Sequence, residues 1–120
     1  MKRILVAEDN PTNRELIREI LESHGYEVVE ASDGKDALEK AESAKPNLIL
    51  LDISMPKLDG YSVLYRLREN PRTAGLPVIA LTAYAMRSDW EKGLAAGFNA
   101  YITKPITARL LLSEIETFLK

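Results

Sequence analysis

The sequence contains no cysteine and only one histidine, His24. Disulfide bonds and thiolate metal sites are therefore excluded, and so is a metal site built from several histidines. A reducing compartment such as the cytosol is compatible with this composition, and we expect the protein to be cytoplasmic. His24 lies near the predicted end of a helix, where the helix dipole favours a solvated imidazole, so we expect no catalytic role for it.

Long apolar runs and a strong charge imbalance are also missing. The N-terminal apolar run, residues 4–7, is too short for a signal-peptide core or a membrane span, so we expect no membrane association. The net charge of −2 gives no electrostatic reason to expect nucleic-acid binding. No glycine loop of the Walker type occurs, which argues against ATP binding. The composition instead predicts one globular domain over residues 1–120, since 46% of the residues are hydrophobic.

What is present is a short apolar run, residues 47–51, that ends in the carboxylate of Asp52. A strand that is covered on both faces reads as a continuous apolar run, so this segment is predicted to be a central parallel strand. In open α/β sheets, ligands bind beyond the carboxyl ends of the strands. Asp52 therefore lies where such folds do chemistry, although on this strand alone an aspartate that merely begins a turn is an equally good interpretation.

The chain as a whole is predicted to contain five strands, each followed by a helix. The predicted strands cover residues 2–7, 26–31, 47–51, 76–81 and 100–102. The connections are long enough only for crossover helices, which gives a parallel sheet with helices on both faces. The predicted fold class is therefore α/β, a flavodoxin-like (βα)5 doubly wound sheet with strand order 2-1-3-4-5.

Helix starts and inward-facing positions follow from local signals. Asn10-Pro11, Asp33-Gly34, Asp59-Gly60 and Thr107 are typical of helix N-termini. Helical spacing then predicts which apolar side chains face the core in the first and last helices. These are Leu16, Ile17, Ile20 and Leu21 in the first helix and Leu110, Leu111, Ile115 and Phe118 in the last.

In the predicted strand order, five polar groups meet at one edge of the sheet: Glu8, Asp9, Asp52, Thr82 and Lys104. Three carboxylates at one edge repel each other, which raises their pKa values unless a cation is present. Oxygen ligands without histidine or cysteine suit Mg²⁺. A metal-assisted hydrolase and a phosphoryl acceptor both fit this set. Because no histidine lies where a general base is needed, the set favours a carboxylate nucleophile that accepts a phosphoryl group with Mg²⁺.

At this point the chain resembles a response-regulator receiver domain. The resemblance covers essentially all 120 residues and is carried by VAEDN (6–10), LDISMP (51–56), DG (59–60), LTA (81–83) and YITKP (101–105). Each fragment alone is weak, but five in order, each at the end of its own strand or at the start of a helix, are highly specific. LTAYAM (81–86) and GLAAG (93–97) are most similar to single-domain regulators of the DivK type and to the receiver modules of hybrid kinases.

This resemblance implies a phosphorelay chemistry of two-component signalling. Asp52 corresponds to the phosphoacceptor, which takes its group from a phosphohistidine on a histidine kinase or a histidine phosphotransfer protein. Glu8 and Asp9 match the acid pair that holds Mg²⁺. Asp52 and the backbone carbonyl of Ser54 complete the implied metal ligands.

The resemblance also assigns the switch. Thr82 matches the hydroxyl that contacts the phosphoryl oxygens, Lys104 the cation that pairs with them, and Tyr101 the aromatic switch residue. It predicts a cis peptide bond between Lys104 and Pro105. Helical spacing alone leaves open a buried Trp90 packed over Gly93 and Gly97. The resemblance instead predicts an exposed Trp90 on the face formed by the fourth helix, the fifth strand and the fifth helix, where a downstream protein target binds.

The implied function is a phosphorylation-dependent signalling switch that is not an enzyme beyond its own phosphorylation and dephosphorylation. Two alternatives stay open. A phosphorylation-independent interaction module would be favoured if Mg²⁺-dependent labelling at Asp52 failed. A small Mg²⁺-dependent phosphohydrolase would be favoured by turnover of a substrate other than the protein's own phosphoaspartate.

Overall fold

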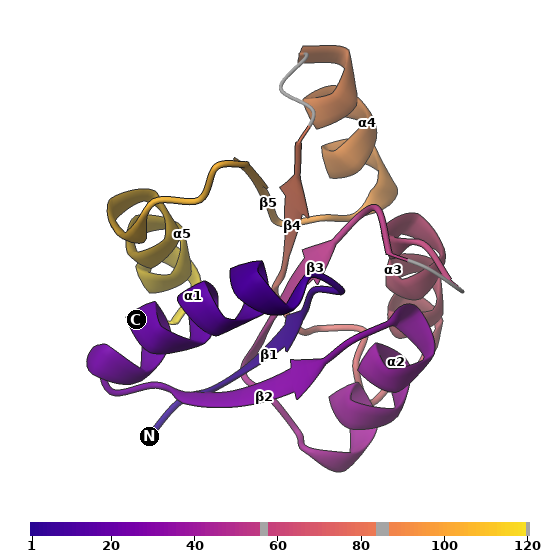
Figure 1. Ribbon diagram of the computed structural model, residues 1–120. Coiled ribbons are helices and arrows are strands. Elements are labelled where there is room, and N and C mark those ends of the chain that lie inside the picture. The colour runs from indigo at the N-terminus through magenta and orange to yellow at the C-terminus, as the bar shows by residue number, and fades with distance from the viewer. Residues whose placement is uncertain (56–57, 84–86, 120) are drawn as a thin grey trace.

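The computed structural model describes residues 1–55, 58–83 and 87–119, without the side chains of residues 87–90. Strands and helices alternate along the chain (Figure 1). The strands are β1 (Arg3–Ala7), β2 (Glu27–Ala31), β3 (Leu48–Asp52), β4 (Val78–Thr82) and β5 (Ala100–Thr103). The helices are α1 (Pro11–Ser23), α2 (Gly34–Ser43), α3 (Gly60–Glu69), α4 (Arg87–Ala96) and α5 (Ala108–Leu119).

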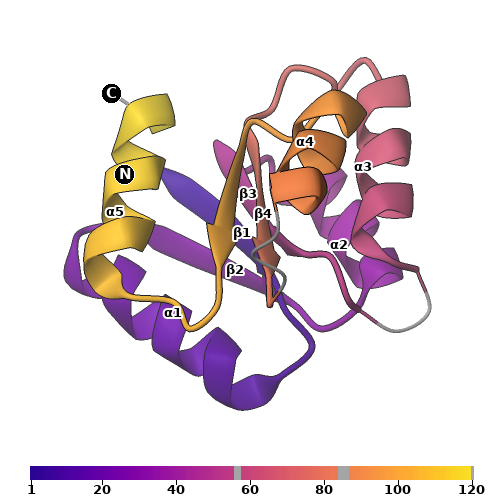
Figure 2. The ribbon, with the colours of Figure 1, turned by 90° about the horizontal axis from the view of Figure 1, so that it is seen from above.

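All strand pairs are parallel, and the strand order is β2-β1-β3-β4-β5. Figure 2 shows α1 and α5 on one side of the sheet and α2, α3 and α4 on the other. The predicted fold class and strand order are therefore confirmed. In the described part of the chain, no helix is both long enough and apolar enough to cross a membrane.

The strands alternate their side chains between two cores. One core lies under α1 and α5, and the other lies under α2, α3 and α4. Every residue of β3 is buried, which confirms that the apolar run before Asp52 is a central strand covered on both faces. β2 is only partly buried and forms one edge of the sheet, also as predicted.

The helix starts follow the predicted capping residues. The Asn10 side chain accepts hydrogen bonds from the amides of Thr12 and Asn13 at 2.9 and 3.1 Å. Asp33 and Asp59 cap α2 and α3 in the same manner. These caps satisfy amides that have no partner within the helix, and they fix where each helix leaves the strand end.

Two of the predicted core positions are wrong. Leu16 and Leu110 are 44% and 40% exposed, whereas their neighbours Ile17 and Leu111 are fully buried. The apolar stripe of each helix is wider than the strip that touches the sheet, so these two leucines lie beside the contact rather than within it. The predicted exposure of Trp90 concerns a side chain outside the described part of the chain.

Candidate functional site

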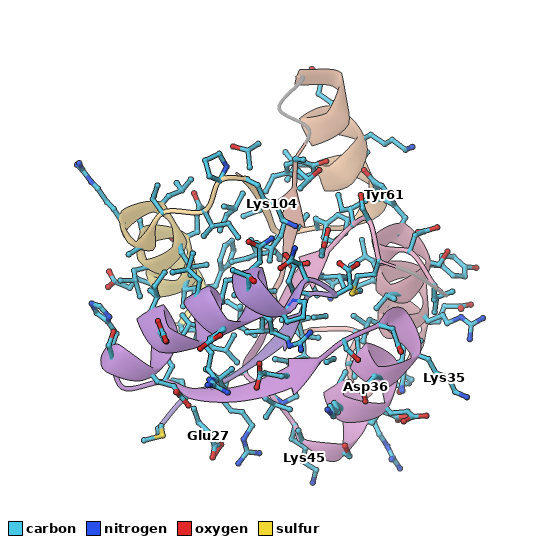
Figure 3. The ribbon with its side chains drawn as sticks, viewed as in Figure 1. Glu27, Lys35, Asp36, Lys45, Tyr61 and Lys104 are labelled. Carbon is cyan, nitrogen blue, oxygen red and sulfur yellow. The ribbon has the colours of Figure 1, made fainter. Side chains whose placement is uncertain are left out.

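The parallel register brings the strand ends to one edge of the sheet. Ala7 of β1 lies opposite Leu51 of β3, and Asp52 lies opposite Leu81 of β4. The residues that follow these pairs therefore meet at the same edge, where Figure 3 shows Lys104. The main chain joins them as well, since the amide of Lys104 donates to the carbonyl of Thr82 at 2.7 Å.

The alternation of the strands divides the polar residues between the two faces. Glu8, Asp52 and Lys104 continue the alternation that points side chains toward α1 and α5. Thr82 continues the other alternation, and Tyr101 is part of the core under α2, α3 and α4. Glu8, Asp52 and Lys104 thus share one side of the edge, while the hydroxyl of Thr82 and the ring of Tyr101 share the other.

Lys104 pairs with two buried carboxylates. Its Nζ lies 2.8 Å from Oε1 of Glu8 and 3.2 Å from Oδ2 of Asp52. The second Asp52 oxygen, Oδ1, accepts a hydrogen bond from the amide of Ser54 at 3.0 Å. Glu8 is 0% and Asp52 3% exposed, so the ion pairs are shielded from water. The peptide bond before Pro105 is cis, as predicted.

This clustering shifts the pKa values of all three groups. Burial, reinforced by the Asp52 carboxylate and opposed by Lys104, raises the pKa of Glu8 from 4.5 to about 7. Burial also acts to raise the pKa of Asp52, but hydrogen bonding with Glu8 and Ser54 and the charge of Lys104 outweigh it, so that this pKa is lowered. Burial acts to lower the pKa of Lys104, but the two carboxylates outweigh it and the pKa is raised. At neutral pH the site therefore contains an ionised Asp52 and a charged lysine.

The three acids are arranged as a cation site would require. Carboxylate oxygens of Glu8, Asp9 and Asp52 all lie within 4.8 Å of one another. Oε1 of Glu8 is buried, and Nζ of Lys104 contacts it at 2.8 Å. A ligand set made only of carboxylate oxygens fits a hard divalent cation such as Mg²⁺.

The Tyr101 ring lies in a recess that a glycine of α4 provides. Tyr101 is only 9% exposed. A Cβ added at Gly93 would lie 2.5 Å from Cε2 of this ring, so only glycine leaves room for it there. Sequence reasoning did not single out Gly93 for this role, although a glycine inside a helix costs stability and signals a packing reason.

A second residue that sequence reasoning missed is Arg14, in the first turns of α1. Its Nη1 donates a hydrogen bond to the main-chain carbonyl of Glu8 at 2.8 Å. The only available signal was a basic residue one turn beyond the N-cap of a helix that follows two acids, and basic residues are common on helix surfaces.

Comparisons with known proteins agree with this geometry. Over 118 residues the chain is 37% identical to the polar-differentiation response regulator DivK of Brucella anthropi, covering 98% of this chain and 96% of that protein. The receiver domain of the sensor histidine kinase PA1611 from Pseudomonas aeruginosa, solved with a magnesium ion coordinated in its active site cleft, is 38% identical with a TM-score of 0.91, covering 98% of this chain and 97% of that one. The chemotaxis protein CheY4 of Vibrio cholerae is 28% identical with a TM-score of 0.92, covering 98% of both chains.

The family comparison matches residues 4–116 to the response regulator receiver domain. Proteins of this family are signalling proteins rather than typical enzymes; they receive phosphoryl groups from histidine kinases and act on downstream partners. With five parallel strands in the order 2-1-3-4-5 and an acidic cluster at their carboxyl edge, the chain belongs to the response regulator receiver family, whose members are phosphorylation-dependent signalling switches.

Proposed function

We propose that Asp52 accepts a phosphoryl group from a phosphohistidine on a histidine kinase or a histidine phosphotransfer protein. The observation that carries this proposal is a buried carboxylate at the end of the central strand, with Lys104 Nζ 3.2 Å from its Oδ2. In the transfer, an Asp52 oxygen forms a bond to phosphorus as the bond between phosphorus and the donor imidazole nitrogen breaks. Because the pKa of Asp52 is lowered, its lone pairs are available without a general base.

Glu8, Asp9, Asp52 and the Ser54 carbonyl would hold Mg²⁺ in this proposal. When bound, the ion neutralises charge on the phosphoryl group and on the acids. The clustering of the three carboxylates within 4.8 Å of one another supports this ligand set. Lys104 already bridges Glu8 and Asp52, and its ammonium would pair with the phosphoryl oxygens once they are attached.

The readout would pass through Thr82 and Tyr101 to the face formed by α4, β5 and α5. In this structure the Tyr101 ring is already buried beside Gly93, so phosphorylation would stabilise a conformation that is populated beforehand. A groove of about 280 Å³ on that face is lined by Leu94, Ala100, Tyr101, Thr103, Leu110 and Glu114. The exposed Leu94 and Leu110 in it offer apolar surface to a downstream protein.

The same proposal treats residues 1–120 as one receiver domain that acts in the cytoplasm, where a kinase would meet it. It assigns the domain neither nucleic-acid binding nor membrane binding. Its net charge of −2 supports the first of these assignments, because nucleic-acid partners require a basic surface.

The phosphoryl-acceptor role is tested by intact mass spectrometry after incubation with a small-molecule phosphodonor. We expect wild type to gain the mass of one phosphoryl group with Mg²⁺ and to gain almost none in excess EDTA. Asp52→Asn, which keeps the shape of the side chain, and Asp52→Ala should gain none. Equal labelling of wild type and both variants would place the acceptor elsewhere, and no labelling of any protein would favour an interaction module that works without phosphorylation.

The readout is tested separately by amide NMR with a phosphoryl mimic and Mg²⁺. We expect shifts that extend from Asp52 into residues 84–104, and we expect Thr82→Ala to lose most of the distant shifts while still binding Mg²⁺. Shifts confined to the surroundings of Asp52 in wild type would show that no such switch operates.

A further inference from the structure

Arg14 makes two hydrogen bonds that link the acidic edge to the neighbouring strand. Its Nη1 donates to the main-chain carbonyl of Glu8 at 2.8 Å. Its Nε donates to Oε1 of Glu30, in β2, at 3.2 Å. The side chain is only 20% exposed, so both contacts are partly shielded from water. The phosphoryl chemistry proposed above assigns Arg14 no role.

The contact with the Glu8 carbonyl fixes the peptide group that leads into Asp9. On its other side, the amide of Glu8 donates to the carbonyl of Ala31 at 3.1 Å, so the main chain of Glu8 is held at both its donor and its acceptor. Because the peptide unit is planar, the orientation of this carbonyl also sets the direction in which Asp9 begins. Asp9 itself is exposed, so packing does not hold its side chain.

Glu30 orients the guanidinium of Arg14. Its Oε1 accepts from Arg14, and its Oε2 accepts from Nη1 of Arg18 at 3.1 Å. The planar guanidinium can serve Glu30 and the Glu8 carbonyl together only in a fixed orientation. Arg18, one turn further along α1, pairs with Glu30 and with Glu22 instead. The two arginines therefore share a helix and a carboxylate, and the bond to the Glu8 carbonyl belongs to Arg14.

We propose that Arg14 is a positioning residue for the metal site. It holds the Glu8–Asp9 peptide group so that the carboxylate of Asp9 is presented beside those of Glu8 and Asp52, without touching the ion itself. This inference rests on the proposed function, because it requires these three acids to bind Mg²⁺. It adds that the affinity for Mg²⁺ depends on Arg14, which contacts the metal-binding segment but not the ion.

Simple electrostatics predicts the opposite change in Mg²⁺ affinity when Arg14 is removed. A positive charge close to a cation site repels the ion, so removal of an arginine there should tighten Mg²⁺ binding if charge were its only contribution. Positioning predicts weaker binding after the same removal. The sign of the change therefore separates the two explanations.

The experiment is a calorimetric titration of Mg²⁺ into the metal-stripped full chain. It compares wild type with Arg14→Met and with the matched control Arg18→Met, since each variant loses one charge next to Glu30 and keeps an unbranched apolar side chain. We expect Arg14→Met to bind Mg²⁺ about tenfold more weakly, at the lower end of the 10–100-fold losses found for outer-shell partners. We expect Arg18→Met to bind as tightly as wild type or slightly more tightly.

An Arg14→Met variant that is folded by circular dichroism and binds Mg²⁺ as tightly as Arg18→Met overturns the role of Arg14 and leaves the proposed function intact. A wild-type protein that binds no Mg²⁺ overturns both. Should Arg14→Met fail to fold, Arg14→Gln and Arg18→Gln provide the same comparison, because glutamine is too short to reach both partners of Arg14. As a readout without metal, the amide resonances of Asp9 and Asn10 should shift in the Arg14 variant and not in the Arg18 variant.

Discussion

The two faces of the sheet are filled in different ways. The buried residues of the core under α1 and α5 are all isoleucine, leucine or valine, for example Leu50 and Ile79. The core under α2, α3 and α4 instead contains several alanines, such as Ala41 and Ala80, together with the large ring of Tyr101. Small side chains let helices approach the sheet closely and leave recesses for an aromatic ring. The face under α1 and α5 is thus filled by branched aliphatic side chains, whereas the face under α2, α3 and α4 packs around an aromatic ring.

The same division separates the proposed chemistry from the proposed readout. The alternation of the strands puts Glu8, Asp52 and Lys104 on the filled side and Thr82 and Tyr101 on the side of α4. A phosphoryl acceptor needs groups that stay in place, whereas a switch needs one that can change position. This contrast leads to four tests, which run from the largest expected effect to the smallest.

The filled face should be most sensitive to loss of volume. Leu50→Ala removes a fully buried side chain from the centre of the α1 and α5 core. We expect the free energy of unfolding to fall by about 3 kcal/mol, within the usual range for such cavities. Urea denaturation followed by circular dichroism measures it. A loss below about 1 kcal/mol would mean that this core can collapse and is not a rigid platform.

The face with small residues should instead be sensitive to added volume. Ala80→Val adds two methyl groups at a fully buried strand position beside β3 and β5. Valine is the better strand residue, yet we expect a loss of about 2 kcal/mol, because overpacking a full core forces strain. The same denaturation experiment checks it. A gain in stability would show that this face has spare volume and would break the contrast with the α1 and α5 side.

The acidic edge should make stability depend on pH when no metal is present. The pKa of Glu8 is raised from 4.5 to about 7, so between these values the folded state holds a proton that the unfolded state has lost. The stabilisation of the folded state by the proton on Glu8 is fully present below pH 4.5 and is lost as the pH rises through 7. We expect the free energy of unfolding in EDTA to fall by about 2 kcal/mol between pH 5.5 and pH 8.5.

Two controls assign that slope to Glu8. The raised pKa of Lys104 and the lowered pKa of Asp52 fall outside this pH window, so neither should contribute. Glu8→Gln should remove most of the slope, and excess Mg²⁺ should reduce it in wild type because the ion favours the ionised carboxylate. A slope that persists unchanged in Glu8→Gln would have to come from another group.

The smallest effect concerns the recess for Tyr101. In an exposed helix, Gly→Ala usually stabilises by about 1 kcal/mol, but the new Cβ of Gly93→Ala would lie 2.5 Å from the Tyr101 ring. We expect the substitution to destabilise wild type by about 1 kcal/mol through this clash. In a Tyr101→Ala background the same change should be stabilising. A double-mutant cycle measures the coupling, and additive effects would mean that ring and glycine are independent.

Much of the fold followed from local sequence signals. The strands and the capped helix starts were predicted, because apolar patterns and capping residues depend on near neighbours in the chain. The strand order followed from the crossover rule and from the common orders of doubly wound sheets, not from a local signal. The boundary errors were small; β4 begins at Val78 rather than at residue 76 and includes Thr82. The exposure of Leu16 and Leu110 was missed, since helical spacing gives the direction of a side chain but not how far the neighbouring element extends.

By itself, then, the sequence determined the alternation of strands and helices and the polar residue that ends each central strand. Only the tertiary structure decided that Lys104 bridges Glu8 and Asp52, although 52 residues of chain separate it from Asp52 and still more from Glu8, and that burial raises the pKa of Glu8. It also decided that the Glu8 carbonyl meets Arg14, and that Gly93 makes room for Tyr101. The physical reason is that periodicity is a property of a short segment, whereas burial, charge and steric fit are sums over every element that the crossover connections bring to one place.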